Sequence, residues 1–193
     1  MKRVHVVLYD NFEALDVFGP VEALGITDEY KIHFVSLDGG IIENDQSIKI
    51  VTEPMKSIQN NEILLIPGGF GSRKIINDER FINALTEAAV NAEYVLCVCT
   101  GSALAAKTGI LDGKNATSNK SAFDWVINQG PKVKWNREAR WVVDKNIYTS
   151  AGVSAGMDMA VGFIRDRFGE EKALTVCREM EYHWNDDWEH DTF

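Results

Sequence analysis

The sequence predicts an α/β fold, a mostly parallel β-sheet with helices on both faces, from two observations. Runs of consecutive apolar residues occur within EILLIPGG (62–69) and YVLCVC (94–99), and such runs are typical of strands buried on both sides. Segments with helical apolar spacing separate these runs, as the crossovers of a parallel sheet require. Because no repeat, low-complexity tract or Pro/Ser-rich linker interrupts the 193 residues, we expect one domain spanning 1–193.

The N-terminal half is expected to begin with a strand at VHVVLY (4–9), which Asp10-Asn11 ends. A helix follows within 12–26, where apolar residues recur at helical spacing and Gly19-Pro20 predicts a bend or the first turn of the helix proper. The remaining elements of this half are a strand at 31–37, a hairpin over 41–53 and a buried strand at 62–69 that ends in a glycine turn.

The C-terminal half continues the alternation of helices and short strands. Its expected helices are 79–92, 101–111, 122–130, 154–169 with Ser154 as the N-cap, and 170–184. Its expected strands are 94–99, 115–119 and a hairpin over 139–152. The acidic, aromatic segment DDWEHD (186–191) is expected at the surface, where it could also close over the pocket of either protomer.

The composition disfavours several classes of function. A formal charge of −9 and a pI near 4.9 argue against nucleic acid as a partner, because phosphate backbones repel an acidic protein. No apolar run approaches the roughly 18 residues needed to span a membrane, and no small-residue cleavage site follows MKRVHVVLYD. We therefore expect no membrane association and a cytoplasmic location.

The cysteines are Cys97, Cys99 and Cys177, an odd number in a chain without a secretion signal, so a disulfide framework is not expected. No metal is expected at the Cys97-x-Cys99 pair, because none of the four histidines has metal-ligand spacing to it. Residues two apart on a strand share one face, so Cys97 is expected to be a core neighbour of Cys99.

Cys99 is the strongest candidate for a functional side chain. It lies where a buried strand turns into a small-residue helix, a corner that exposes a nucleophile and lowers its pKa through the helix N-terminus. Asp16 and Gly68-Gly69 follow two other strands and converge on the same edge, where the glycine N–H groups could bind a developing negative charge. The alternatives are a buried, inert cysteine and an Asp16 that only caps its helix. Glu13 is a candidate neighbour of the site, but a solvated position is favoured.

Several segments, read in order, resemble the ThiJ/PfpI superfamily of class I glutamine-amidotransferase-like proteins. They are LYDNFEALDVFGPVEAL, LLIPGGFG, VLCVCTGSALAAKTGILDGKNAT, TSAGVSAGMDMAVGFI and EYHW. The resemblance implies a flavodoxin-like three-layer sandwich and usually a homodimer. It implies a nucleophilic Cys99 on a strained elbow, with Asp16 hydrogen-bonded to the thiol. Gly69 falls on the amide that faces the cysteine, and Thr100 on a second amide and a hydroxyl.

Within that superfamily, the chain is most similar to the branch that contains isonitrile hydratase and the sensor domains of AraC-type regulators. Superfamily peptidases and many glyoxalase-type members have His directly after the cysteine, whereas this chain has Thr100, as the hydratase branch does. The resemblance implies a small-molecule substrate: Cys99 and Asp16 add water to an isonitrile through a thioimidate, giving an N-substituted formamide without a cofactor. Hydratase-like members often carry His-Trp where this chain has Ser118-Asn119-Lys120.

Two alternative classes of function stay open. Another cysteine enzyme on the same scaffold, such as an amidase or protease, a glyoxalase or a deglycase, needs a base near Cys99. His183 and a residue of a dimer partner are the candidates. A ligand- or redox-sensing protein without turnover needs only a binding pocket or an oxidisable thiol.

Overall fold

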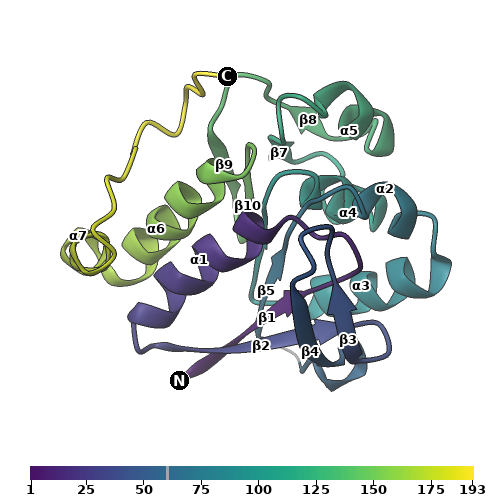
Figure 1. The fold of residues 1–193 in the computed structure, drawn as a ribbon. Coiled ribbons are helices and arrows are strands. Elements are labelled where there is room, and N and C mark those ends of the chain that lie inside the picture. The colour runs from purple at the N-terminus through teal and green to yellow at the C-terminus, as the bar shows by residue number, and fades with distance from the viewer. Residues whose placement is uncertain (60) are drawn as a thin grey trace.

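The computed structural model describes residues 1–59 and 61–193, and its centre is an eight-stranded sheet of order β3-β4-β2-β1-β5-β6-β10-β9 (Figure 1). The strands are β1 (Lys2–Val7), β2 (Tyr30–Ser36), β3 (Gly40–Glu43), β4 (Lys49–Pro54), β5 (Ile63–Ile66), β6 (Tyr94–Cys97), β9 (Trp141–Asp144) and β10 (Ile147–Ser150). All strand pairs of this sheet are parallel except the edge pairs β3–β4 and β9–β10. The short strands β7 (Asn115–Ala116) and β8 (Lys134–Trp135) pair separately. The predicted mostly parallel sheet is confirmed.

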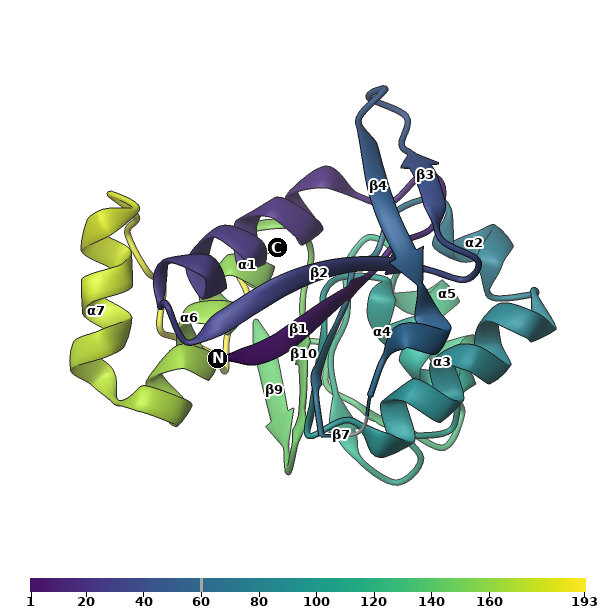
Figure 2. The same cartoon turned by 90° about the horizontal axis from the view of Figure 1, so that it is seen from below.

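Helices cover both faces of the sheet, as Figures 1 and 2 show. One face carries α1 (Ala14–Ile26), α6 (Ser154–Phe168) and α7 (Glu170–Glu179). The other face carries α2 (Ser72–Ile75), α3 (Glu79–Asn91), α4 (Gly101–Lys107) and α5 (Phe123–Gln129), with the 3₁₀ turn η1 (Met55–Ser57) beside α3. None of the described helices combines the length and the apolar character needed to cross a bilayer.

The strand residues alternate between two apolar cores. In β5, Ile63 and Leu65 enter the core under α1 and α6, whereas Leu64 and Ile66 enter the core under α3 and α4. This period of two follows from the pleat of the strand, and it explains why the central strands are apolar throughout. The three-layer sandwich follows directly from strands that must be covered on both sides.

Two predictions about helix starts differ from the structure. The helix α1 runs from Ala14 with Pro20 inside it, so Pro20 does not begin the helix. It lies very close to α6 at Gly19, where an added Cβ would come within 2.4 Å of Met157 Cγ. The N-cap of α6 is Val153, not Ser154, and no side chain caps this end.

The C-terminal helix is shorter than predicted, because its last residues bind a buried charge cluster. The helix α7 ends at Glu179 instead of 184, and the chain then runs along α6 toward β9 (Figure 1). Asp158, which is 1% exposed, accepts hydrogen bonds at Oδ1 from the Tyr182 hydroxyl at 2.8 Å and from the Asn185 N–H at 3.0 Å. The Trp184 indole donates to the Asp158 carbonyl at 3.0 Å. These bonds compete with continuation of the helix.

Arg140 is the cation of this cluster and ties the C-terminal segment to the sheet. Its Nε and Nη2 donate to Asp158 Oδ2 at 2.8 and 2.6 Å, and its Nη1 donates to Asp191 Oδ1 at 3.0 Å. Its backbone N–H donates to the Trp188 carbonyl at 2.9 Å. The acidic segment 186–191 lies at the surface, as predicted, with residues 186–190 exposed, and it is attached there through Asp191 and Trp188.

We expect Arg140→Met to destabilise the fold by about 3–5 kcal/mol, because the substitution leaves two buried carboxylates without their cation. The loss is measured as the free energy of unfolding in urea. The matched control is Arg80→Met, which removes an exposed Arg80–Asp38 pair and should change stability by less than about 1 kcal/mol. Equal losses in the two variants would refute the structural role of the Arg140 cluster.

Candidate functional site

Cys99 lies at a sharp turn between β6, which ends at Cys97, and α4, which begins at Gly101. Its φ of 56° is in the left-handed region that side chains other than glycine rarely adopt. Hydrogen bonds hold this conformation: the Cys99 N–H donates to the Ala151 carbonyl at 3.2 Å, and the Cys99 carbonyl accepts from the Ser102 and Ser118 hydroxyls, each at 2.9 Å. The expected elbow is present, and the surrounding chain fixes it.

The elbow separates the two neighbouring cysteines and buries the second one, contrary to two predictions. Cys97 belongs to the core under α3 and α4, whereas Cys99 belongs to the core under α1 and α6, because the strand stops before the turn. Cys99 is only 6% exposed rather than raised at the rim of the sheet. A reagent can therefore reach its sulfur only from the pocket that it lines.

Asp16 lies in the first turn of α1 and is fully buried. Its Oδ2 accepts a hydrogen bond from the Gly68 N–H at 2.9 Å. Its Oδ1 has no partner of hydrogen-bonding geometry among the described residues, but the carboxyl group lies within interaction range of the Cys99 side chain and the Val153 N–H. Asp16 is thus a buried carboxyl group beside the thiol, not a helix cap.

Burial dominates the protonation of this pair. It raises the pKa of Asp16 from 3.8 to about 7; the Gly68 N–H opposes the rise, and the charge of Glu13 adds to it. Burial also raises the pKa of Cys99, and the charge of Asp16 raises it further. The prediction of a lowered thiol pKa is therefore wrong, since desolvation outweighs the favourable bonds from Thr100 and Val153.

Because the two groups interact, their protons belong to the pair. When Asp16 is protonated, its charge no longer opposes a thiolate beside it. A pair that holds one proton can therefore present a thiolate next to a carboxylic acid. This arrangement supplies a nucleophile and an acid at the same point.

The amides around the sulfur differ from those expected. The Gly68 N–H is engaged with Asp16, and the Gly69 N–H donates to Thr100 Oγ1 at 3.1 Å, so neither is free to bind a developing charge at the thiol. The N–H groups that favour charge on the sulfur are those of Thr100 and Val153, together with the Thr100 hydroxyl. Gly68 and Gly69 therefore position Asp16 and Thr100.

Val153 is a site residue that sequence reasoning missed. It has φ 43° and ψ −90°, a conformation that a β-branched residue adopts only under strain. No pattern in the sequence signals it, because valine is among the residue types least suited to a positive φ. The strain places its N–H toward both Cys99 and Asp16.

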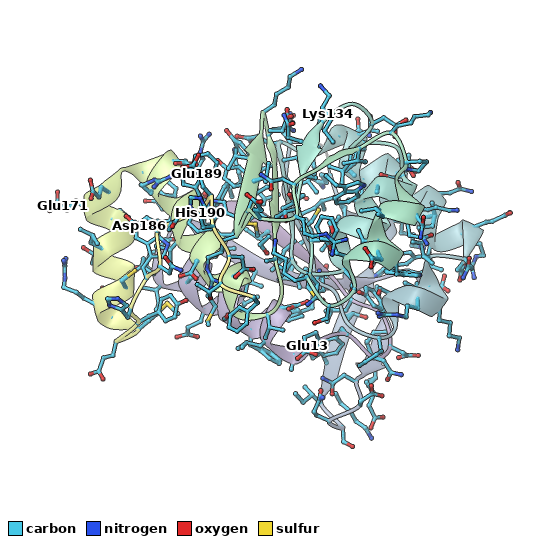
Figure 3. All side chains as sticks on the ribbon, turned by 90° about the horizontal axis from the view of Figure 1, so that it is seen from above. Glu13, Lys134, Glu171, Asp186, Glu189 and His190 are labelled. Atoms are coloured by element: carbon cyan, nitrogen blue, oxygen red, sulfur yellow. The ribbon has the colours of Figure 1, made fainter. Side chains whose placement is uncertain are left out.

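A pocket of about 220 Å³ opens above Cys99. Its lining residues are Glu13, Gly69, Phe70, Arg73, Cys99, Thr100, Asn119, Ser121, Ala122 and Val153. Asp16 does not line it, whereas Glu13, expected to be solvated, does and is half-buried. In Figure 3, Glu13 lies well apart from Asp186, Glu189 and His190, and none of these C-terminal residues lines the pocket of their own chain.

Histidine does not line this pocket in the described part of the chain. His5 is a buried residue of β1 and pairs with Glu62, and its ring lies 5.5 Å from that of His33 on the neighbouring strand β2. His190 binds Asp187 in the C-terminal segment. The pocket therefore provides no Cys–His pair of the kind that cysteine peptidases use.

The chain is similar to proteins with several different names. A model of the DJ-1/PfpI family matches residues 2–166. Isonitrile hydratase from Pseudomonas putida is 27% identical, with 93% of this chain and 78% of the relative covered. The HTH-type transcriptional regulator GbdR from Pseudomonas aeruginosa is 25% identical, and the match spans 94% of this chain but only 51% of the regulator.

Solved structures share the fold. A THiJ/PfpI family protein from Pseudomonas syringae superposes with a TM-score of 0.87 at 26% identity, covering 95% of this chain and 76% of that chain. Drosophila melanogaster DJ-1beta superposes with a TM-score of 0.79 at 20% identity, and the match covers 95% of this chain and 99% of that chain. The second similarity concerns the fold alone.

The rate at which iodoacetamide alkylates Cys99 should rise about tenfold per pH unit and level off above about pH 7, because the pair loses its first proton there. In Asp16→Asn this plateau should vanish and the rate should keep rising, since the buried thiol then titrates alone. Glu13→Gln should move the inflection to lower pH, because it removes a charge that raises the pKa of Asp16. A wild-type inflection that survives in Asp16→Asn would contradict this assignment.

Gly68→Ala should disrupt the site, because the added Cβ would meet Thr100 N and Oγ1 at 2.6 Å and Asp16 Oδ2 at 2.9 Å. We expect a loss of about 1–3 kcal/mol in unfolding free energy together with a changed alkylation pH profile. The control is Gly25→Ala in α1, where nothing lies within 4 Å of the added Cβ, and which should stabilise the protein slightly. An unchanged Gly68→Ala pH profile would show that the Asp16–Gly68 contact is dispensable.

Proposed function

The chain belongs to the DJ-1/PfpI family, and on that premise we propose that it is a cysteine-dependent hydratase that adds water to an isonitrile. The product is an N-substituted formamide. The observation that carries the proposal is the buried Asp16 carboxyl group beside the Cys99 thiol, with the pKa of Asp16 raised to about 7. The similarity to isonitrile hydratase from Pseudomonas putida supports it.

In the first half of the reaction, the acid and the nucleophile both act on the terminal carbon of the isonitrile. The Cys99 thiolate attacks the terminal carbon of R–N≡C and forms a C–S bond, while Asp16 transfers its proton to the same carbon, giving the thioimidate Cys–S–CH=N–R. Because both new bonds form on one carbon, the acid must lie directly beside the sulfur, where Asp16 is found. Acyl transfer differs, since its proton goes to a leaving group displaced from the nucleophile.

The second half hydrolyses the thioimidate. A water molecule from the pocket adds to the CH=N carbon, and one of its two protons goes to the nitrogen. The C–S bond then breaks to release R–NH–CHO and the thiolate, while the second proton returns the Asp16 carboxylate to its acid form. We assign to Glu13 the orientation of this water, because it is the lining carboxylate, whereas Asp16 lies beneath the sulfur. Thr100 and Val153 N–H groups favour the departing thiolate.

The competing functions fit the site less well. An amidase, protease or glyoxalase of the Cys–His type lacks its histidine among the described lining residues. A redox sensor works best with an exposed thiol of low pKa, whereas Cys99 is buried with a raised pKa. A ligand-binding protein without turnover is the alternative that the similarity to GbdR suggests. The homodimer and the cytoplasmic location stay predictions.

We expect the wild-type protein to convert cyclohexyl isocyanide to the formamide, measured by chromatography. Cys99→Ala should lose all turnover, and Asp16→Asn should lose about 10²–10⁴-fold in kcat/KM, the usual contribution of a general acid. Glu13→Gln should slow formamide release more than isonitrile consumption, so that the thioimidate accumulates on the protein. Cys177→Ala, whose thiol lies on α7 outside the pocket, is the control. Binding of the isonitrile without formamide in the wild type would favour the ligand-sensing alternative.

A further inference from the structure

We propose that Arg73 selects substrates that carry a carboxylate, which it binds at the mouth of the Cys99 pocket. The inference deepens the proposed function and rests on it for the identity of the reacting group, Cys99. It names the substrate class as a small organic anion whose electrophilic carbon reaches the sulfur.

The first observation is that Arg73 is a cation without an anionic partner. It is the cationic residue among the described lining residues of the pocket. Every other arginine in the described residues has an ion pair or a side-chain hydrogen bond to another residue. The guanidinium of Arg73 has neither within the described part of the chain, so its donors are available to a ligand.

The second observation is that two aromatic rings hold this guanidinium in place. Arg73 Cζ lies 5.2 Å from the centre of the Phe70 ring and 4.9 Å from that of Trp125. Contacts with ring faces leave the in-plane N–H groups of a guanidinium free, and these match the two oxygens of a carboxylate. Because Trp125 belongs to α5 and Arg73 to α2, the contact also restrains an exposed side chain that lines the pocket.

The third observation is the charge of the surroundings. Glu13 lines the same pocket, Asp16 lies beneath it, and the whole chain has a formal charge of −9. Such a field repels anions, and a neutral electrophile needs no cation to enter. An arginine without an anionic partner in the pocket that the thiol lines therefore indicates an anionic substrate. The planar fork and the volume of about 220 Å³ fit one carboxylate better than a large polyanion.

The test compares iodoacetate with iodoacetamide, which alkylate the same thiol and differ in carrying a carboxylate or an amide. The ratio of their rate constants at Cys99, measured by intact-protein mass spectrometry, should fall about 10- to 100-fold in Arg73→Met. Lys74→Met is the matched control, because Lys74 is exposed on the same short helix and lines a different pocket. Its ratio should stay at the wild-type value, and Arg73→Lys should restore part of the loss.

A ratio that falls equally in Arg73→Met and Lys74→Met, or in neither, would overturn the inference. The alkylation measures the thiol and its pocket without requiring turnover, so it separates this inference from the hydratase proposal. If the ratio falls as expected and no isonitrile is hydrated, the hydratase proposal fails and the role of Arg73 stands. If both hold, isocyanoacetate should have a lower KM than its ethyl ester, and Arg73→Met should remove the difference.

Discussion

The contact between a buried carboxyl group and a buried thiol is the constraint on which the rest of the site depends. A shift in the pKa of Asp16 from 3.8 to about 7 corresponds to about 4 kcal/mol. Because the pKa of Asp16 is higher in the folded state than in the unfolded chain, the charged carboxylate destabilises the folded state above pH 7. This destabilisation disappears as the pH falls below 4, where the group is protonated in both states. The fold therefore tolerates a destabilising group at neutral pH, as functional sites often do.

The order of the strands explains how this contact forms. The neighbouring strands β1, β5, β6 and β10 run parallel, so the segments that follow them emerge at one edge of the sheet. Asp16 follows β1, Gly68 follows β5, Cys99 follows β6 and Val153 follows β10. Each strand supplies one part of the site, and the loops need only be short to bring these parts together.

The segment after β10 contains Val153, which has a positive φ, as Cys99 does, and hydrogen bonds hold this segment on both sides. The Ala151 N–H donates to the Arg140 carbonyl at 2.8 Å, while the Ala151 carbonyl accepts from the Cys99 N–H. Arg140 is bound by Asp158 and by Asp191 of the C-terminal segment. The strained backbone at Val153 thus lies between the nucleophile and a buried ion cluster, which explains how an unfavourable φ persists there.

The sequence by itself determined the layers of the fold and the three strand ends that carry Asp16, Gly68 and Cys99. Apolar periodicity is local, and burial on both faces of a strand leaves a direct trace in it. Apolar periodicity also located most helices to within a few residues. The errors arise where tertiary contacts end an element: the hydrogen bonds of Tyr182 and Asn185 to Asp158 accompany the end of α7. Only the tertiary structure decided the protonation of the Asp16–Cys99 pair, the part of Val153, and the meeting of Glu13 and Arg73 at one pocket. Desolvation and charge proximity depend on the distances between elements, and no local pattern of residues encodes them.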